Sequence, residues 1–419
     1  MATNDTTKSN TRQGAQAKHT GYYTGVCKSL ELTNKILPES GVWFHDCYSE
    51  GNTDPLIEYV NNTTRQGVLI LGTDFTQPNT PDDVFSQKRI FKNILPLIEK
   101  YLQQIKSGEV KLIFYLQDFW STRCDWEIDG EINTGGIHTY DIYNWVYPQL
   151  VDLGIVHNSC FLSPLPLEGV SVHKDFPLYN YNYSFNIYLY LKQFDIKVNS
   201  KHTNKFLWLN RRPRDHRIYA LYKMHQQNIL EDCVWSFNVY DENNAFDDSF
   251  VHERIQHLTG EQTNIQLPQP IDDIWTKEND AHLYSMLTMQ RTHQMYGSVW
   301  LDVISEYNYS DHRPFIDEKI AKSIVLKKPF VVFADRHFLR QLKSQGFKTF
   351  DSFWNESYDD LIGYQSRIDS AVNTLKYIQH NIDTNGYSEE MQEILEYNHW
   401  HYFNTYREQQ MHTIEKIIQ

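Results

Sequence analysis

Five runs of apolar residues, each followed by a segment with helical spacing, constrain the fold of this chain most strongly. The runs are GVLIL at 67–71, VKLIFYL at 110–116, KFLWLN at 205–210, VWLDVIS at 299–305 and PFVVFA at 329–334. Continuous apolar runs of this length suit strands that are buried on both faces of a parallel sheet. Strands that alternate with helices predict an α/β fold in which helices cross over a parallel sheet.

Apolar residues at helical spacing follow these strands. The predicted helices cover residues 84–106, 140–153, 215–227, 317–326 and 337–345. Two shorter strands are expected at 42–44 and 347–350, and a Gly-rich loop at 129–136. Ser388 precedes Glu389 and Glu390, an arrangement that favours the start of a helix, which we expect to extend to Gln419.

The polar segment 197–204 separates two strand–helix series. We therefore predict an α/β protein with two Rossmann-like lobes, whose parallel sheets face a central cleft, and a C-terminal helix. The expected divisions are a disordered tail at 1–20, an N-terminal lobe at 21–200, a second lobe at 201–385 and the C-terminal helix at 386–419.

Composition limits the partners and the compartment. The chain has 39 basic and 53 acidic residues, a formal net charge of −14, and so repels phosphate polymers at long range. Its five Cys residues form no CxxC pair, which fits a reducing compartment. The polar N-terminus lacks the apolar core of a signal peptide, and no apolar run approaches the ~18 residues of a membrane span. We expect a cytoplasmic protein.

A cluster of arginines follows the strand at 205–210. The sequence NRRPRDHR contains Asn210, Arg211, Arg212, Arg214 and Arg217 and leads into a predicted helix. Guanidinium groups pair with phosphate oxygens bidentately, and a helix N-terminus adds free N–H groups and partial positive charge. These residues predict a diphosphate-binding loop, and the alternative is a solvated loop held by salt bridges.

A second polar segment, SDHRPFIDEKI, lies between the strand at 299–305 and the next helix. Glu306 ends the strand, Arg313 lies in the loop, and Glu318 and Lys319 open the helix. Glu318 is a candidate acceptor for ribose hydroxyls, and Lys319 is a candidate phosphate ligand. The alternative is that these carboxylates, with Asp317, only complement the helix dipole or end a strand.

Three polar residues of the N-terminal half are candidate general bases. Asp74 follows GVLIL, Asp118 follows VKLIFYL, and His138 follows Gly135-Gly136. Ligands of open α/β sheets bind beyond the carboxyl ends of the strands, where a base must reach the acceptor hydroxyl. The alternative for each Asp is a turn or helix cap.

Several familiar motifs are missing from the sequence. It has no Walker A motif, no GxGxxG after the first strand, no HExxH and no GxSxG. The 18 His residues show no metal-ligand spacing, and the pairs Asp247-Asp248 and Asp272-Asp273 fall in expected loops. We expect chemistry that needs no metal and no permanently bound cofactor.

The segment ISEYNYSDHRPFIDEKIAKSIVLKKPFVVF resembles the donor-binding region of two-lobed glycosyltransferases, particularly the fucosyltransferase-like and exostosin-like groups. In those groups a strand with an acidic end is followed by a Glu-Lys helix start and by a strand such as KPFVVF. NRRPRDHR and LKKPFVVF also resemble segments of uncharacterised glycosyltransferase-like proteins of large bacteriophages. The resemblance covers about the second half of the chain.

The resemblance implies a glycosyltransferase of the two-lobed (GT-B) kind that moves a hexose or pentose from a nucleotide-diphosphate-sugar to a hydroxyl acceptor. It places the donor in the lobe at 201–385, with Glu318 on the ribose or sugar and Lys319 and an Arg of 211–217 on the diphosphate. The lobe at 21–200 would bind the acceptor, a glycan or a modified nucleobase in DNA. In a virus-encoded enzyme the site of action would be the host cytoplasm.

One alternative belongs to another functional class. Fold alone does not fix function, so an inactive transferase scaffold can serve as a glycan-binding or virion-associated protein. The segment at 179–190, which is rich in Tyr and Asn, offers rings that can stack on sugars. This alternative predicts no nucleotide binding.

Overall fold

The structure is a computed structural model of the 419-residue chain. It describes residues 42–46, 67–73, 95–96, 98–116, 126–128, 131–133, 139–163, 171–182, 185, 202–210, 213–237, 248–268, 295–306, 309, 314–316 and 318–418. The chain divides into two compact units, Met1–Tyr190 with Glu408–Gln419, and Leu191–Arg407.

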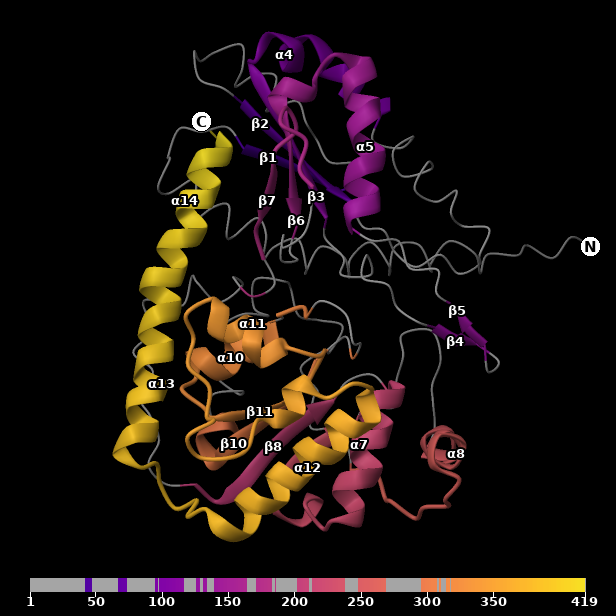
Figure 1. The fold of residues 1–419 in the computed structure, drawn as a ribbon, viewed down its shortest axis with the longest axis vertical. Coiled ribbons are helices and arrows are strands. Elements are labelled where there is room, and N and C mark those ends of the chain that lie inside the picture. Colours follow the sequence, from indigo (N-terminus) through magenta and orange to yellow (C-terminus); the bar gives the residue numbers. More distant parts are fainter. Residues whose placement is uncertain are drawn as a thin grey trace, which may run out of the picture. The chain divides into compact units, whose positions relative to one another are not determined.

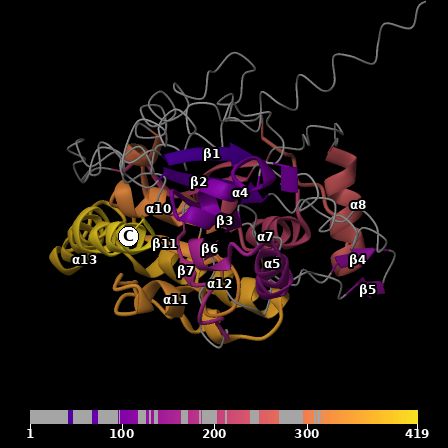
Figure 2. The same cartoon turned by 90° about the horizontal axis from the view of Figure 1, so that it is seen from above.

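The first unit contains a five-stranded parallel sheet (Figures 1 and 2). The spatial order β1-β2-β3-β6-β7 follows the chain, as Figure 2 shows. The strands are β1 (Val42–Asp46), β2 (Gly67–Thr73), β3 (Val110–Leu116), β6 (Ser159–Ser163) and β7 (Leu178–Asn180). The apolar runs at 67–71 and 110–116 thus form adjacent strands, as the sequence predicts.

Two helices accompany this sheet, α4 (Leu102–Ser107) and α5 (Thr139–Leu153). Tyr143 of α5 stacks on Phe176 with ring centroids 5.1 Å apart, and its hydroxyl donates to the Phe176 carbonyl oxygen at 2.6 Å. The buried ring thus has a partner for its polar end, as buried tyrosines usually do. A short antiparallel hairpin, β4 (Trp126–Ile128) and β5 (Glu131–Asn133), occupies part of the segment expected to be a Gly-rich loop.

The long helix predicted at 84–106 is interrupted in its described part. Tyr101 has φ −108° and ψ 11°, outside the helical region, and its N–H donates to Ile98 three residues back. The ring of Tyr101 is fully buried in the core of this unit. The predicted end is correct, because Gly108 closes α4 with φ +81°, a conformation that favours glycine.

The second unit contains a four-stranded parallel sheet in the order β11-β10-β8-β9 (Figure 1). The strands are β8 (Asn204–Asn210), β9 (Cys233–Phe237), β10 (Val299–Ser305) and β11 (Phe330–Phe333). Every residue of β10 and β11 is buried, which explains their continuous apolar sequences. β9 was not predicted from the sequence. It follows Glu231 and Asp232 at the start of a stretch rich in acidic residues.

Helices accompany the second sheet. Those at Asp215–Gln226, Glu318–Val325 and Phe338–Ser344 were predicted from periodicity, whereas those at Asp248–Thr259 and Tyr364–Asn381 were not. α12 packs against α7 and β11, and α10 packs against β10 and α13. The helices are α7 (Asp215–Gln226), α8 (Asp248–Thr259), α10 (Glu318–Val325), α11 (Phe338–Ser344), α12 (Tyr364–Asn381) and α13 (Glu389–His401), with single 3₁₀ turns at Leu230–Asp232 and Ser357–Asp360. A further 3₁₀ turn, Val156–Asn158, lies in the first unit. The prediction of an α/β fold with parallel sheets is confirmed.

The predicted C-terminal helix is present and starts as expected. The Ser388 hydroxyl accepts the N–H of Met391 at 3.3 Å and so caps α13. A π-helical turn at Tyr402–Tyr406 joins α13 to α14 (Arg407–Ile418). No helix in the described part of the chain is long and apolar enough to cross a membrane.

The strand predicted at 347–350 is wrong. Its backbone groups pair with side chains instead of a neighbouring strand. The amide of Asn398 accepts from the Lys348 N–H and donates to the Lys348 carbonyl, both at 2.8 Å. The Phe350 N–H donates to the Glu356 carboxylate at 2.9 Å. An apolar pattern shows that a segment is buried, but it does not identify the partner of its backbone.

The burial of Lys328 predicts that the free energy of unfolding depends on pH. Its ammonium group is buried and donates to the Val299 carbonyl at 2.7 Å and the Tyr387 hydroxyl at 3.3 Å. Burial lowers the pKa of Lys328 from 10.5 to about 7, so between these values the unfolded chain binds a proton that the folded chain does not. The free energy of unfolding should therefore rise from pH 7 to pH 9.5, by at most ~1.4 kcal/mol per pH unit from this group.

Urea unfolding of wild type and Lys328→Met at several pH values in this range measures the effect. The variant should lose this part of the pH dependence, whereas Lys348→Met, at an exposed lysine, should keep it. Equal slopes in wild type and Lys328→Met would show that the ammonium group keeps its ordinary pKa.

Candidate functional site

Polar residues occupy the carboxyl ends of three adjacent strands in the second unit. Asn210 is the last residue of β8, Glu306 follows β10 directly, and Asp335 follows β11 by two residues. All three are buried, with exposed fractions of 2%. The strands are parallel, so their carboxyl ends lie on one edge of the sheet, where open α/β sheets bind ligands.

The backbone carbonyl of Glu306 is held by the first turn of α7. His216 Nε2 lies 3.2 Å from this oxygen, and Arg217 Nη2 donates to it at 3.1 Å. Arg217 Nη2 also donates to the Ser305 carbonyl at 3.2 Å. The junction between β8 and α7 is thus fixed to the end of β10.

The side chain of Glu306 faces the start of α10. Lys319 Nζ lies 3.6 Å from Glu306 Oε2 and 3.1 Å from Glu318 Oε1. Glu306 is almost fully buried, whereas Lys319 and Glu318 keep about a quarter to a third of their side chains exposed. Glu306 therefore connects two strand-to-helix junctions, β8–α7 through its backbone and β10–α10 through its carboxylate.

His216 acts as a fixed hydrogen-bond donor. Burial lowers its pKa well below the ordinary value, and the nearby guanidinium groups of Arg217, Arg214 and Arg367 lower it further. The imidazole is therefore neutral at physiological pH. Because its partner is a carbonyl oxygen, Nε2 carries the proton. His216 positions Glu306 and does not exchange protons there.

An aromatic and guanidinium stack supports the segment after β10. The Tyr309 ring stacks on His216 at 5.0 Å, with 18° between the planes, and the guanidinium carbon of Arg367 lies 5.0 Å from the same ring. Arg367 is 1% exposed, and its Nη1 donates to the Leu361 carbonyl at 2.9 Å. Sequence reasoning missed Tyr309 and Arg367, because neither lies in a motif and they are far apart in the chain.

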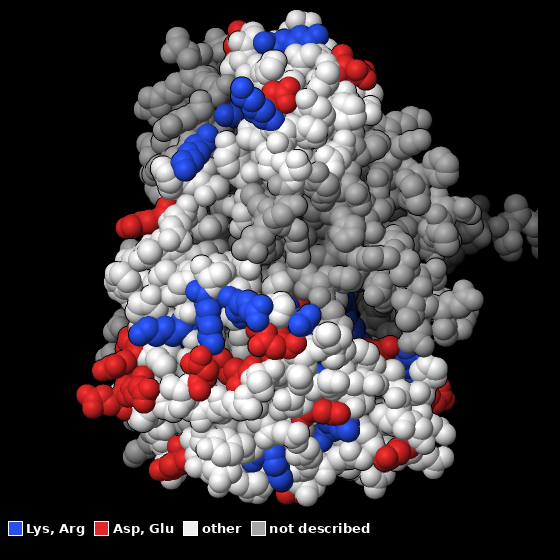
Figure 3. Space-filling model, in the orientation of Figure 1, with Lys and Arg blue, Asp and Glu red and all other residues white. Residues whose placement is uncertain are grey.

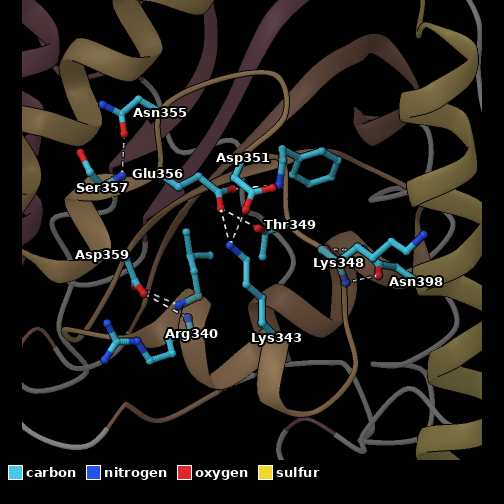
Figure 4. Close-up of polar contacts among 12 residues, drawn as sticks. Arg340, Lys343, Lys348, Thr349, Asp351, Asn355, Glu356, Ser357, Asp359 and Asn398 are labelled. Atoms are coloured by element: carbon cyan, nitrogen blue, oxygen red, sulfur yellow. Dashed lines mark hydrogen bonds and ion pairs between the residues drawn. The ribbon is translucent and has the colours of Figure 1, made fainter.

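The starts of α7 and α11 have different N-cap residues, Arg214 and His337. The side chain of Arg214 makes no capping hydrogen bond of its own. At α11, the Asp359 carboxylate accepts from the N–H groups of Leu339 at 2.9 Å and Arg340 at 3.0 Å (Figure 4). The N–H groups at the start of α11 are thus used by the protein itself.

Exposed cations also occur on α11, but they are paired. Arg340 lies 2.6 Å from Asp360, and Lys343 lies 2.8 Å from Asp351 and 3.5 Å from Glu356. Figure 3 shows basic and acidic side chains side by side on this face, and Figure 4 shows Lys343 beside Asp351 and Glu356. These pairs neutralise the charge of the cations on this face.

The structure brings four of the sequence-predicted site residues into one contact network: Arg217, Glu306, Glu318 and Lys319. Asn210 lies on the neighbouring strand end and Arg214 at the start of α7. Arg217 is 5% exposed and binds carbonyl oxygens, so its guanidinium supports the site from within. The remaining candidates lie outside the described residues: Asp74, Asp118, His138, Arg211, Arg212 and Arg313.

The elements next to the three candidate bases are described. β2 ends at Thr73, directly before Asp74, and β3 ends at Leu116, two residues before Asp118. Thr73 and Leu116 are register partners in adjacent parallel strands. α5 begins at Thr139, directly after His138. Among the described residues, no group of three His, Cys, Asp or Glu side chains could hold a metal ion.

The contrast between Arg217 and Arg214 is testable. Arg217→Ala removes a buried donor from the carbonyl oxygens of Ser305 and Glu306, and should lower the free energy of unfolding by about 2–4 kcal/mol. Arg214→Ala, at the more accessible N-cap position, should change it by no more than about 0.5 kcal/mol. Chemical denaturation measures both, and similar losses in the two variants would contradict the assignment.

Comparison with known proteins gave structural matches only. No protein-family model and no curated protein matches the chain. Among solved structures, phage T4 BGT with UDP and Mn²⁺ matches with 11% identity and TM-score 0.35, over 86% of this chain and 84% of that chain. The phage T4 BGT structure with UDP-glucose matches with 12% identity and TM-score 0.34, over 86% of this chain and 83% of that chain. A structure of the DNA-modifying enzyme beta-glucosyltransferase matches with 12% identity and TM-score 0.38, over 86% of this chain and 83% of that chain. Such values assign neither a family nor an activity.

Proposed function

We propose that the chain is a glycosyltransferase that moves a sugar from a nucleotide-diphosphate-sugar to a hydroxyl acceptor. The donor would bind at the carboxyl edge of the second unit's sheet, between the starts of α7 and α10. Glu318 would accept hydrogen bonds from the ribose or the sugar. Lys319 and arginines of the 211–217 loop would contact the diphosphate, together with Arg313.

The contacts of Glu306 carry the proposal. Arg217 donates to its carbonyl oxygen at 3.1 Å, and Lys319 lies 3.6 Å from its carboxylate. Two junctions that are far apart in sequence therefore meet at one residue. A diphosphate needs cations and N–H groups from more than one direction, and the starts of α7 and α10 would supply them.

This arrangement suits the chemistry of glycosyl transfer. The reaction builds positive charge at the anomeric carbon and negative charge on the departing diphosphate. Cationic groups held at fixed positions stabilise the leaving group where this charge develops, without further reorganisation. Lys319 is held by Glu306 and Glu318, so its ammonium group is already positioned before the donor binds.

The first unit would bind the acceptor, a glycan or a modified nucleobase. A base there must take the proton of the acceptor hydroxyl. Asp74 and Asp118 follow adjacent parallel strands whose last residues are in register, which supports a shared position at the edge of that sheet. His138, directly before α5, is the third candidate. We propose metal-independent transfer, with the nucleotide-sugar as co-substrate.

Nucleotide binding is the first test. Thermal shift with UDP, GDP, ADP and their sugars should identify a nucleotide that stabilises the wild-type protein. Lys319→Ala should then weaken that nucleotide roughly 10- to 100-fold in calorimetry, because it removes a charge-assisted contact to phosphate. Lys319→Arg should restore part of the affinity.

Lys343→Ala is the matched control, because it removes a lysine whose partners are Asp351 and Glu356. It should leave nucleotide affinity unchanged. A wild-type protein that binds no nucleotide, or a Lys319→Ala variant with unchanged affinity, would contradict the proposed donor site. The first result would favour a glycan-binding scaffold.

Catalysis is tested separately from binding. Asp74→Asn, Asp118→Asn and His138→Gln should each leave nucleotide affinity intact. One of them should lower sugar transfer by about 10²- to 10⁴-fold, as expected on loss of a general base. Transfer is measured with the nucleotide-sugar selected above, against a panel of glycans and hydroxymethylated DNA. Full activity in all three variants would exclude these residues as the base.

A further inference from the structure

Asn210 is a buried amide whose hydrogen-bonding groups are unused. It ends β8, one of the two central strands of the second sheet, and is 2% exposed. Neither Oδ1 nor Nδ2 has a hydrogen-bond partner among the residues that the structure describes, and both atoms are inaccessible to solvent. Buried polar side chains are paired in the large majority of cases, so this exception requires an explanation.

The surroundings of Asn210 are mostly apolar. It is the register partner of Phe237 on β9. Trp208 precedes it by two residues and therefore points to the same face of the sheet. Trp208 packs against Phe237 with ring centroids 6.0 Å apart and donates Nε1–H to the Ser305 hydroxyl at 2.8 Å. An aliphatic side chain would suit this setting better than an amide.

The position of Asn210 connects the unused amide with the proposed donor site. It lies at the carboxyl edge on β8, beside β10, which leads to Glu306, and it precedes the arginine-rich loop. A polar group that reduces stability at a ligand-binding edge is expected where the ligand completes its hydrogen bonds.

The chemistry of an amide restricts which group of the ligand it meets. Asn carries an acceptor and two donors side by side. A phosphate oxygen only accepts, so it would leave Oδ1 unpaired, and a cation only donates, so it would leave Nδ2 unpaired. A hydroxyl group, or the donor–acceptor edge of a nucleobase, satisfies both atoms.

We infer that Asn210 binds a neutral group of the donor that both donates and accepts hydrogen bonds: a ribose hydroxyl, a hydroxyl of the transferred sugar or the edge of the nucleobase. This inference rests on the proposed function and adds a specificity-determining residue to it.

Asn210→Leu tests the inference by two measurements on the full chain. Leu has a similar size and no polar group, so the melting temperature should stay the same or rise by about 2–4 °C. Affinity for the donor should fall roughly 10- to 100-fold, because the ligand group loses its partner. A purely structural residue would not change these two quantities in opposite directions.

Ser236→Ala is the matched control. Ser236 lies on the neighbouring strand β9, and its Oγ is likewise buried without a partner among the described residues. Its register partner is Leu209, whose side chain points to the face opposite Asn210. Ser236→Ala should therefore resemble Asn210→Leu in stability but keep wild-type affinity for the donor.

Three ligands distinguish the sources of the hydrogen-bonding group: the best-binding nucleoside diphosphate, its 2′-deoxy analogue and its sugar-bearing form. A loss of affinity that is absent with the 2′-deoxy analogue assigns Asn210 to the ribose. A loss seen only with the sugar-bearing form assigns it to the transferred sugar, and an equal loss with all three assigns it to the nucleobase.

Two results would overturn the inference while the proposed function stands. One is equal affinity of wild type and Asn210→Leu for all three ligands. The other is a clear drop in melting temperature of Asn210→Leu, which would show that the amide has a partner within the folded protein. A wild-type chain that binds none of the nucleotides overturns both proposals together.

Discussion

The second unit is organised around the buried residue Glu306. Its carbonyl accepts from His216 and Arg217 of α7, while its carboxylate lies 3.6 Å from Lys319 of α10. A carboxylate that is 2% exposed is unfavourable without a cation, and a buried carbonyl needs a donor. These requirements fix the starts of two helices against one strand end. The remaining features of the candidate site depend on that arrangement.

The arginines of the candidate site divide into two groups by their surroundings. Arg217 and Arg367 are buried, at 5% and 1% exposure, and their guanidinium groups donate to backbone carbonyls. Arg214 lies at the N-cap position of α7 and is only partly buried. The buried arginines supply positive charge and rigidity from within, and they add to the larger effect of burial in lowering the pKa of His216.

Sequence patterns located many of the strands and helices, but they did not identify which groups pair with the backbone of each segment. Apolar runs located β2, β3, β8, β10 and β11, because strands buried on both faces require apolar residues throughout. The same reasoning failed at 347–350, where the Asn398 and Glu356 side chains replace a neighbouring strand. It also missed β9, which lies in an acidic stretch and is only half-buried over its first three residues.

The sequence by itself determined the α/β class, the strands formed by the apolar runs, the cap at Ser388 and the positions of polar residues after strands. These depend on local spacing and on the chemistry of single residues. The tertiary structure alone decided that Glu306 meets both Arg217 and Lys319, and that the Asn210 amide stays unpaired. Contacts between residues some 90 positions apart depend on strand register and helix packing. No local pattern encodes them, because many distant residues must be placed at the same time.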